Sequence, residues 1–405
     1  MRVAVLGAGL SGTLVALELA EAGHHVSLFD RRDIPFAGAS LACEGKIHLG
    51  FVYALDGTLR TARAMQAGAS TFRRLIARWT GPALFDRALS GPFLYAMPRD
   101  SLLPTDAIRA HFHAVTDASR SVMGPATTPE CDASWQELPP GQYDQLFDPE
   151  RIRAVFRTQE RAIDTAELAR ALRDALAGSP RITPRMGCQI TAVAQRDACF
   201  AVHGTCEKET FAEPFDIVVN ALWEHRLLID STLGLTTPRD VMHRFKCGLF
   251  TRAAQVLDRV PNVTFLIGAF GDTVTFPGTA YLSWYPAGLV SQETGLQPRA
   301  QDPDLPPDQA RRIVTGTLDH LRALLPGVAD ALTDDPALWT LKGGWITAWG
   351  RSGIDDAASE LHQRHDLGVF STGNYHSVET GKLTTAPLFA ARACARILER
   401  HGTPR

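Results

Sequence analysis

The feature that most constrains this chain is a glycine-rich turn close to its amino end. The short apolar run Val3–Leu6 leads directly into G-A-G-L-S-G at residues 7–12. A helical pattern follows, with Leu14 and Leu17 on one side, and it ends near Gly23. A continuous apolar run is typical of a parallel strand that is covered on both faces. The pattern therefore predicts the strand, turn and helix that open a doubly wound α/β domain.

The spacing of the glycines predicts a dinucleotide site. Gly7 permits the tight turn, Gly9 lets the backbone approach a pyrophosphate, and Gly12 lets the helix pack closely on the strand. The amino end of the helix offers free N–H groups and a positive dipole to the phosphates. We therefore expect Leu10 and Ser11 at the start of this helix to contact the cofactor as well.

A carboxylate follows at the distance that a ribose requires. The run His25–Phe29 predicts a second strand that ends at Asp30, about twenty residues after the glycines, where a carboxylate accepts from ribose hydroxyls. Asp30 disfavours a 2′-phosphate, because two negative groups would meet. Arg31 and Arg32 could pair with such a phosphate, so NADP stays open on these residues alone.

The stretch after Asp30 bears on the choice of cofactor. A simple NAD dehydrogenase would continue with a crossover helix, whereas residues 36–51, F-A-G-A-S-L-A-C-E-G-K-I-H-L-G-F, are rich in turn formers. This stretch resembles the flavoprotein superfamily that contains D-amino-acid oxidase, sarcosine oxidase and glycine oxidase. In that superfamily the corresponding segment runs past the pyrophosphate to the flavin. The resemblance implies FAD, with NAD(P) as the alternative.

Three more segments support the resemblance, in the superfamily's order. They are E-R-A-I-D-T-A-E-L at 160–168, D-I-V-V-N-A-L-W at 216–223, and G-N-Y-H at 373–376 together with G-K-L-T-T-A-P at 381–387. Asp164 and Glu167 have the spacing that caps a helix. Pro387 suits the first turn of a final helix. The resemblance thus extends over the whole chain.

The fold expected from the resemblance is α/β, with two interleaved domains. One is a Rossmann-like FAD-binding domain of the glutathione-reductase-2 type, and the other is an α+β substrate domain built on an antiparallel sheet. We assign residues 1–80, 151–224 and 341–405 to the FAD-binding domain, and residues 81–150 and 225–340 to the substrate domain. The length of 405 residues allows two or three domains.

The substrate domain shows strand signals in only one of its two parts. Residues 81–150 contain Pro139-Pro140-Gly141 and are expected to be irregular. The second part predicts four strands and one helix, at 246–250, 263–267, 274–276, 280–285 and 308–325. Pro277-Gly278 predicts a tight turn between the last two strands, which would pair as a hairpin.

The residues expected to bind FAD come from the motif, from the resembling segments and from the strands between them. They are Gly7, Gly9, Leu10, Ser11, Gly12, Asp30, Arg31, Ser40, Ile190, Ala221, Gly373, Asn374, Gly381, Lys382, Leu383 and Thr384. The final helix would present its amino end to the flavin N1/C2 carbonyl region and stabilise negative charge there. We expect FAD to be bound non-covalently, although Cys43 and Cys247 are conceivable points of attachment.

Four residues are candidates for chemistry: Lys46, His48, Tyr285 and Arg351. Lys46 matches the place of a basic residue that lies near the flavin in the resembling oxidases, and a surface lysine is the alternative. His48 either faces the reacting centre or bonds a backbone carbonyl. Tyr285 would line the substrate cavity. Arg351 would grip a substrate carboxylate, with Arg244 as its rival and a surface ion pair as the alternative.

Composition excludes several other classes of function. The 41 basic residues less the 44 acidic ones give a net charge of −3, so the chain offers no general basic surface to nucleic acid. Seven scattered cysteines without C-x-x-C favour reduced thiols and predict no metal site. Residues 14–22 carry Glu18 and Glu21 and cannot span a membrane. No secretory signal is evident, which predicts a cytoplasmic protein. The oligomeric state is not predicted.

The function expected is oxidation of a small metabolite at a carbon that bears an amine. Hydride would pass to flavin N5 and leave an imine, and oxygen or another acceptor would then reoxidise the flavin. Three alternatives stay open. The first is oxidation of a hydroxy acid or a sugar at C–OH, the second is a flavin-binding partner protein without turnover, and the third is reduction driven by NADPH.

Overall fold

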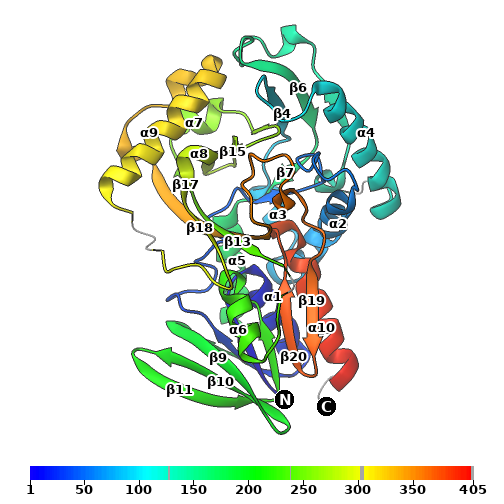
Figure 1. Ribbon diagram of the computed structural model, residues 1–405, viewed down its shortest axis with the longest axis vertical. Helices are drawn as coiled ribbons and strands as arrows, with labels where there is room; N and C mark the ends of the chain where they lie inside the picture. The colour runs from blue at the N-terminus through cyan, green and yellow to red at the C-terminus, as the bar shows by residue number, and fades with distance from the viewer. Residues whose placement is uncertain (126–127, 238, 302–304, 403–405) are drawn as a thin grey trace.

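The computed structural model describes residues 1–125, 128–237, 239–301 and 305–402 (Figure 1). A six-stranded sheet lies at the lower end of Figure 1, close to both chain termini. Its order is β19-β20-β12-β1-β2-β8, and only the β19–β20 pair is antiparallel. The strands are β1 (Arg2–Leu6), β2 (His25–Phe29), β8 (Ile182–Arg185), β12 (Ile217–Asn220), β19 (Gly368–Thr372) and β20 (Tyr375–Glu379).

Helices cover one face of this sheet and a small sheet covers the other. The helices are α1 (Leu10–Glu21), α2 (Arg60–Thr80), α5 (Thr165–Ala177) and α10 (Ala386–His401), and α10 packs on both α1 and α2. The small sheet consists of β9 (Cys188–Arg196), β10 (Cys199–Cys206) and β11 (Glu209–Phe215). Both faces of β1 are therefore buried, which explains its unbroken apolar sequence.

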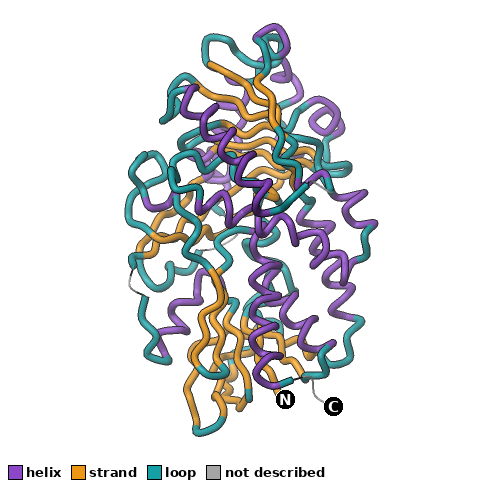
Figure 2. Tube along the Cα trace, turned by 90° about the vertical axis from the view of Figure 1, so that its right-hand side faces the viewer, coloured by secondary structure: helices purple, strands orange, loops and turns teal. Residues whose placement is uncertain are grey.

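A second, larger sheet lies at the upper end. Its order is β17-β13-β16-β15-β14-β4-β6-β5, with β18 on the free edge of β13, and only the β14–β4 pair is parallel. The strands are β4 (Leu94–Pro98), β5 (Trp135–Glu137), β6 (Ile152–Thr158), β13 (Val241–Thr251), β14 (Val263–Phe265), β15 (Gly271–Thr275), β16 (Ala280–Trp284), β17 (Leu289–Thr294) and β18 (Thr340–Trp349). Figure 2 shows strands gathered at both ends of the molecule.

The remaining elements pack around the six-stranded sheet and the large sheet and connect the two. The α-helices are α3 (Ala83–Ala88), α4 (Thr105–Val122), α6 (Arg226–Thr232), α7 (Ala254–Arg259), α8 (Tyr285–Gly288) and α9 (Pro307–Leu324). Short 3-10 helices span Pro129–Cys131, Pro140–Gln142, Trp223–His225, Pro326–Ala331, Pro336–Leu338, Glu360–His362 and Leu383–Thr385. A two-stranded ribbon, β3 (Lys46–Ile47) and β7 (Arg161–Ala162), lies between the two sheets.

The α/β class and the opening strand, turn and helix are as predicted. The cap of α5 is also confirmed, since the Asp164 side chain accepts from the N–H groups of Ala166 and Glu167. The hairpin expected around Pro277-Gly278 forms between β15 and β16.

Two expectations about the chain's organisation do not match the sheets. Residues 81–150 contain α3, β4, α4 and β5 rather than irregular chain, because α4 buries an apolar stripe that includes Ile108, Phe112 and Val115. Strands β6 and β18 belong to the large sheet, so the boundaries drawn at 151 and 341 do not follow it. The positions of β4, β6 and β18 follow from their pairing with strands that are distant in the sequence.

One expectation about the cysteines is wrong. Cys188 and Cys206 face each other on the antiparallel strands β9 and β10 and form a disulfide. The cysteines described as free thiols are Cys43, Cys131, Cys199, Cys247 and Cys394. Sequence spacing cannot show this pairing, because it depends on the register of the hairpin.

Among the described residues, no helix combines the length and the apolar character that a membrane span requires.

Candidate active site

A cleft opens at the carboxyl ends of β1 and β12, between the two sheets. Its walls include Gly7, Gly9, Leu10, Ser11, Asp30, Arg31, Ser40, Ile190 and Ala221 from the lower half. On the upper side they include Phe245, Lys246, Tyr281, Gly344 and Trp345. The carboxyl edge of a doubly wound sheet is the usual position of a ligand site.

The glycine turn leaves room for a ligand at one position only. Gly7 has φ +98°, and a Cβ on Gly12 would lie 1.7 Å from the Gly7 carbonyl oxygen. A Cβ on Gly9 would meet only the Ser40 hydroxyl, at 3.3 Å. Gly7 and Gly12 are therefore required by the turn itself, whereas Gly9 keeps open the space in which a pyrophosphate would lie against α1.

Asp30 is held in position at the end of β2. One of its oxygens accepts from the Ala8 N–H at 2.8 Å, and the other accepts from the Arg32 N–H at 2.9 Å. Arg31 forms an ion pair with Glu224 at 2.6 Å and contacts His225. Because Arg31 already has a carboxylate partner, it is not free to bind a 2′-phosphate.

The loop before α10 forms the opposite end of the cleft. Gly381, Lys382 and Leu383 line it, as expected. Thr384 lies behind this wall, where its hydroxyl accepts from the His48 N–H at 2.9 Å and donates to the Lys46 carbonyl at 3.1 Å. Thr384 thus fastens β3 to the loop and does not line the cleft.

Gly373 and Asn374 do not contribute to the cleft. They form the turn between β19 and β20, and the Asn374 amide donates to the Asp216 carbonyl at 3.1 Å. β20 is parallel to β12, so its first residues lie at the amino edge of the sheet, opposite to the edge that carries Gly7. The expectation that these residues contact FAD is corrected, because the G-N-Y-H segment is a hairpin turn and the segment before α10 faces the cleft.

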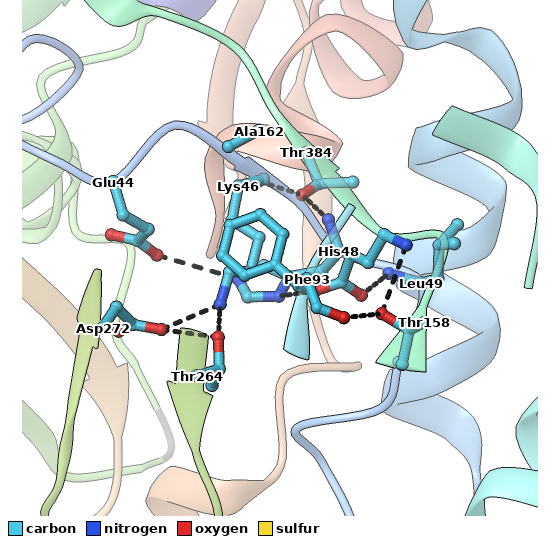
Figure 3. A network of polar contacts seen from close by, with 12 residues as sticks. Glu44, Lys46, His48, Leu49, Phe93, Thr158, Ala162, Thr264, Asp272 and Thr384 are labelled. Atoms are coloured by element: carbon cyan, nitrogen blue, oxygen red, sulfur yellow. Dashed lines mark hydrogen bonds and ion pairs between the residues drawn. The ribbon is translucent and has the colours of Figure 1, made fainter. Parts of the chain in front are cut away.

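Lys46 is a buried anchor rather than a surface lysine (Figure 3). Its ammonium group donates to Asp272 on β15 at 2.8 Å and to Thr264 on β14. The nitrogen also lies 4.4 Å from the centre of the Phe93 ring. Burial by itself would raise the pKa of Asp272, but the charges of Lys46 and Lys246 lower it to about 2. This ion pair joins β3 to the large sheet.

His48 lines the cleft, and neither of its ring nitrogens has a hydrogen-bond partner; the dashed lines from its ring in Figure 3 mark longer contacts with carboxylates. Its Nδ1 lies 3.6 Å from Glu160 and its Nε2 lies 3.8 Å from Glu44, which is beyond hydrogen-bond distance. Burial lowers the pKa of His48, so the neutral imidazole dominates at pH 7. Glu160 is occupied by the Leu49 N–H at 2.6 Å and by the Tyr95 hydroxyl.

Tyr285 and Arg351 have different surroundings. Tyr285 is buried at the start of α8, where its hydroxyl accepts from Arg244 at 2.7 Å, and neither residue forms the cleft wall. Arg351 is exposed and pairs with Asp240 at 2.6 Å. The expectation that Arg351 binds the substrate is therefore corrected, because β18 ends just before Arg351 and leaves it at the surface. Its rival Arg244, on β13, is buried.

A match to a family model shows the family to which this chain belongs. The model described as DAO, FAD-dependent oxidoreductase, matches residues 2–345. The chain belongs to this family. FAD is therefore its cofactor, and the protein is an enzyme.

Solved structures with this fold extend along the whole chain. Glycine oxidase from Geobacillus kaustophilus has a TM-score of 0.67 and 16 % identity, and the match covers 98 % of this chain and 95 % of the other. Iminodiacetate oxidase from Chelativorans sp. BNC1 also has a TM-score of 0.67 and 16 % identity, with 99 % of each chain covered. L-α-glycerophosphate oxidase from Mycoplasma pneumoniae, with FAD bound, has a TM-score of 0.67 and 14 % identity, with 98 % and 94 % covered.

This FAD-dependent oxidoreductase has side chains in and beside its cleft that the motifs did not indicate. They are Glu44, Tyr53, Lys246 and Arg364, together with Glu160. Lys246 lies two residues after Arg244 on β13, and alternation along a strand places both on one face. The sequence R-F-K-C-G-L-F at residues 244–250 carried a signal for these cations, because two basic residues on one face interrupt an otherwise apolar strand.

The electrostatics of the cleft centre on Lys382 and Glu44. Burial, reinforced by Arg364 and Arg244, lowers the pKa of Lys382 to about 8, while Glu44 opposes this shift. Burial would raise the pKa of Glu44, but Lys382 and the other nearby cations outweigh it and hold the pKa below its usual value. Glu44 is therefore an ionised carboxylate that faces the cleft.

Proposed function

We propose that this FAD-dependent oxidoreductase oxidises a small metabolite at a carbon that bears an amine, giving an imine that hydrolyses. The observation that carries the proposal is Glu44. Its carboxylate faces the cleft, and no donor among the described residues lies within hydrogen-bond distance of it. An ionised, unsatisfied carboxylate is suited to receive the N–H groups of an amine.

Glu44 and the residues near it would each have a separate role in such a reaction. FAD, when bound, supplies the acceptor for the hydride and is then reoxidised by oxygen or another acceptor. The substrate reacts as the neutral amine, after its ammonium form has lost a proton to solvent, and Glu44 accepts hydrogen bonds from its N–H groups. Arg244, supported by Tyr285 and next in sequence to the cleft-lining Phe245, would bind an acidic group of the substrate that extends past the cleft wall. Lys382 keeps positive charge next to the first turn of α10.

The motif end of the cleft would hold the cofactor. Gly9, the N–H groups at the start of α1 and Asp30 would bind the pyrophosphate and ribose, and Gly381–Leu383 would lie at the flavin end. We propose that FAD is bound non-covalently. Burial raises the pKa of the Cys43 thiol in the cleft wall to about 12, which keeps it protonated and a poor nucleophile. Acid precipitation should release yellow FAD into the supernatant, and flavin that stays with the pellet would refute this.

One observation favours a second candidate, oxidation of C–OH in a hydroxy acid. His48 is neutral, lines the cleft and has no hydrogen-bond partner, which suits a base that takes the proton of a hydroxyl group. The two candidates differ in the group that contacts the reacting end of the substrate: Glu44 accepts the N–H groups of an amine, whereas His48 takes the proton of a hydroxyl.

An anaerobic screen of flavin bleaching separates these candidates. The FAD-loaded protein is mixed with amines, amino acids, hydroxy acids and NADPH, and the flavin absorbance is followed. We expect amines to bleach it, Glu44→Gln to lose most of the bleaching rate, and Arg351→Gln, a matched surface control, to keep it. Bleaching by hydroxy acids alone would favour oxidation of C–OH, with His48 as the base. Bleaching by NADPH alone, or by no compound, would contradict substrate oxidation.

A further inference from the structure

Two buried arginines lie close to the cleft without an acidic partner. Arg244 is 1 % exposed, and the one acceptor of its guanidinium group among the described residues is the Tyr285 hydroxyl. Its Nε has no partner. Among the described residues no carboxylate lies within ion-pair distance of its guanidinium group. A buried, unpaired guanidinium is costly unless an anion completes it.

Arg364 is the second of these arginines. It is 5 % exposed, and its guanidinium group donates to two backbone carbonyls, those of Leu361 at 3.1 Å and Thr347 at 3.0 Å. The carboxylate that acts on its charge is Glu379, but Glu379 already forms an ion pair with Arg226 at 2.8 Å. The positive charge of Arg364 is therefore not matched by a partner of its own.

The fold brings the two arginines together. Thr347, whose carbonyl accepts from Arg364, lies on β18 next to Ile346, and Ile346 is paired with Arg244 of β13. Burial and, second to it, the charge of Arg244 together lower the pKa of Arg364 to about 10. Both arginines also act on Lys382 in the cleft wall. Like charges gathered in a buried region mark a site for an anion.

Unsatisfied hydroxyl and imidazole groups border the same region. The Tyr53 hydroxyl is buried without a partner, and its ring contacts that of His48 with centres 5.4 Å apart. The charge of Arg364 acts on the Tyr53 pKa, against the rise that burial causes. Arg244 with Tyr285, and Arg364 near Tyr53, thus form two arginine–tyrosine pairs. Each pair offers donors that an acidic oxygen would satisfy.

We propose that the substrate carries two negative charges, one for each arginine–tyrosine pair. This inference rests on the proposed function for the position of the amine, and it adds the class of substrate. The substrate is an amine with two acidic groups, or with a single doubly charged group such as a phosphate or phosphonate. A single carboxylate leaves one of the two arginines without a counter-charge.

The experiment measures the binding of matched anions to the FAD-loaded protein by titration calorimetry at pH 7 and constant ionic strength. Succinate is compared with succinamate, which has the same size and one charge fewer. Sulfate is compared with methanesulfonate for the case of a single doubly charged centre. We expect the dianion of at least one pair to bind about tenfold more tightly or better, since a hydrogen bond to a charged group is lost with the monoanion. Equal affinity within both pairs overturns the proposal.

Variants assign the preference to the arginines. Arg364→Gln should reduce the dianion preference to about one, while Arg351→Gln, a surface arginine paired with Asp240, should keep it. Arg364→Lys retains the charge and should retain part of the preference. Melting temperature and FAD content are recorded for each variant, and the comparison of anions in the unaltered protein decides the proposal if Arg364→Gln does not fold. A preference that persists in folded Arg364→Gln overturns the assignment.

These outcomes separate the inference from the proposed function. If dianions are preferred but no amine bleaches the flavin, the substrate class holds and the amine chemistry fails. If amines bleach the flavin and neither pair of anions shows a preference, the amine chemistry holds and the second charge fails.

Discussion

Most of the motif residues at the nucleotide end of the cleft come from one stretch of chain, residues 7–40, to which Ile190 and Ala221 are added, whereas the substrate end combines side chains from distant segments. Between Gly7 and Ser40, backbone N–H groups, a missing Cβ and one carboxylate form the binding surface. At the substrate end, the surface depends on Glu44 just before β3, Lys246 on β13 and Lys382 in the loop before α10, three segments that are far apart in the sequence. A site made of backbone is tied to local sequence spacing, and a site made of side chains can change without altering the fold.

The largest expected effect tests the nucleotide end. Gly12→Val places a side chain on the Gly7 carbonyl, so we expect the turn and the lower half to fail to fold. Gly9→Val meets only Ser40 within the protein, so we expect folded protein that retains no FAD. Circular dichroism and flavin absorbance measure the two effects. Yellow, FAD-loaded Gly9→Val protein would contradict the assignment of the pyrophosphate site.

The next effect concerns the connection between the two ends. Lys46→Met leaves the half-buried carboxylate of Asp272 without its ion-pair partner, and we expect the free energy of unfolding to fall by about 2 kcal/mol. The double variant Lys46→Met with Asp272→Asn should recover most of this loss, as measured by denaturant unfolding. If the single variant keeps its stability but slows flavin reoxidation, Lys46 acts on the reaction and is not simply an anchor.

A smaller effect should appear as a pH dependence at the substrate end. Lys382 has a pKa of about 8 when folded, below its ordinary value of 10.5, so it is charged below pH 8 and loses its charge above it. Sulfate binding should therefore weaken as the pH rises through about 8, and Lys382→Met should bind weakly without this step. Because the folded protein releases this proton first, Lys382 also makes the free energy of unfolding rise with pH between about 8 and 10.5. A step that persists in Lys382→Met would assign it to another group.

The smallest effect is expected at Arg351. Its pair with Asp240 lies on the surface, where ion pairs contribute little. Arg351→Gln should leave the melting temperature, the FAD content and the bleaching rate unchanged. A large loss of substrate affinity in this variant would show that Arg351 contributes to substrate binding, contrary to its position at the surface.

The same contrast explains what could be predicted from the sequence. The glycine turn, Asp30, the first strand and helix, and the cap of α5 follow from spacing along the chain, because each depends on neighbours within a few residues. The FAD-dependent family follows from these motifs in order. The cofactor contact expected at Gly373 and Asn374 failed because a short glycine motif does not specify which edge of a sheet it occupies.

The substrate end depends on information that is not local. Arg244 and Arg364 lie 120 positions apart and meet because β13 pairs with β18 along its length. The sequence placed Arg351 in the cavity because it follows an aromatic and glycine-rich run, and only the register of β18 shows that the strand has ended there. The cytoplasmic location and the electron acceptor stay predictions.

The interleaved sheet also determines when the protein can acquire its cofactor. β1 lies next to β12, and β12 lies next to β20, so the lower sheet needs strands that begin at residues 2, 217 and 375. A ribosome that adds about 5–20 residues per second delivers the last of these strands on the order of tens of seconds after the first. During most of that interval β1 has β2 beside it but lacks β12, and β12 in turn lacks β20. We therefore expect FAD to be loaded only at the end of synthesis, and a chain shortened before α10 to retain no cofactor.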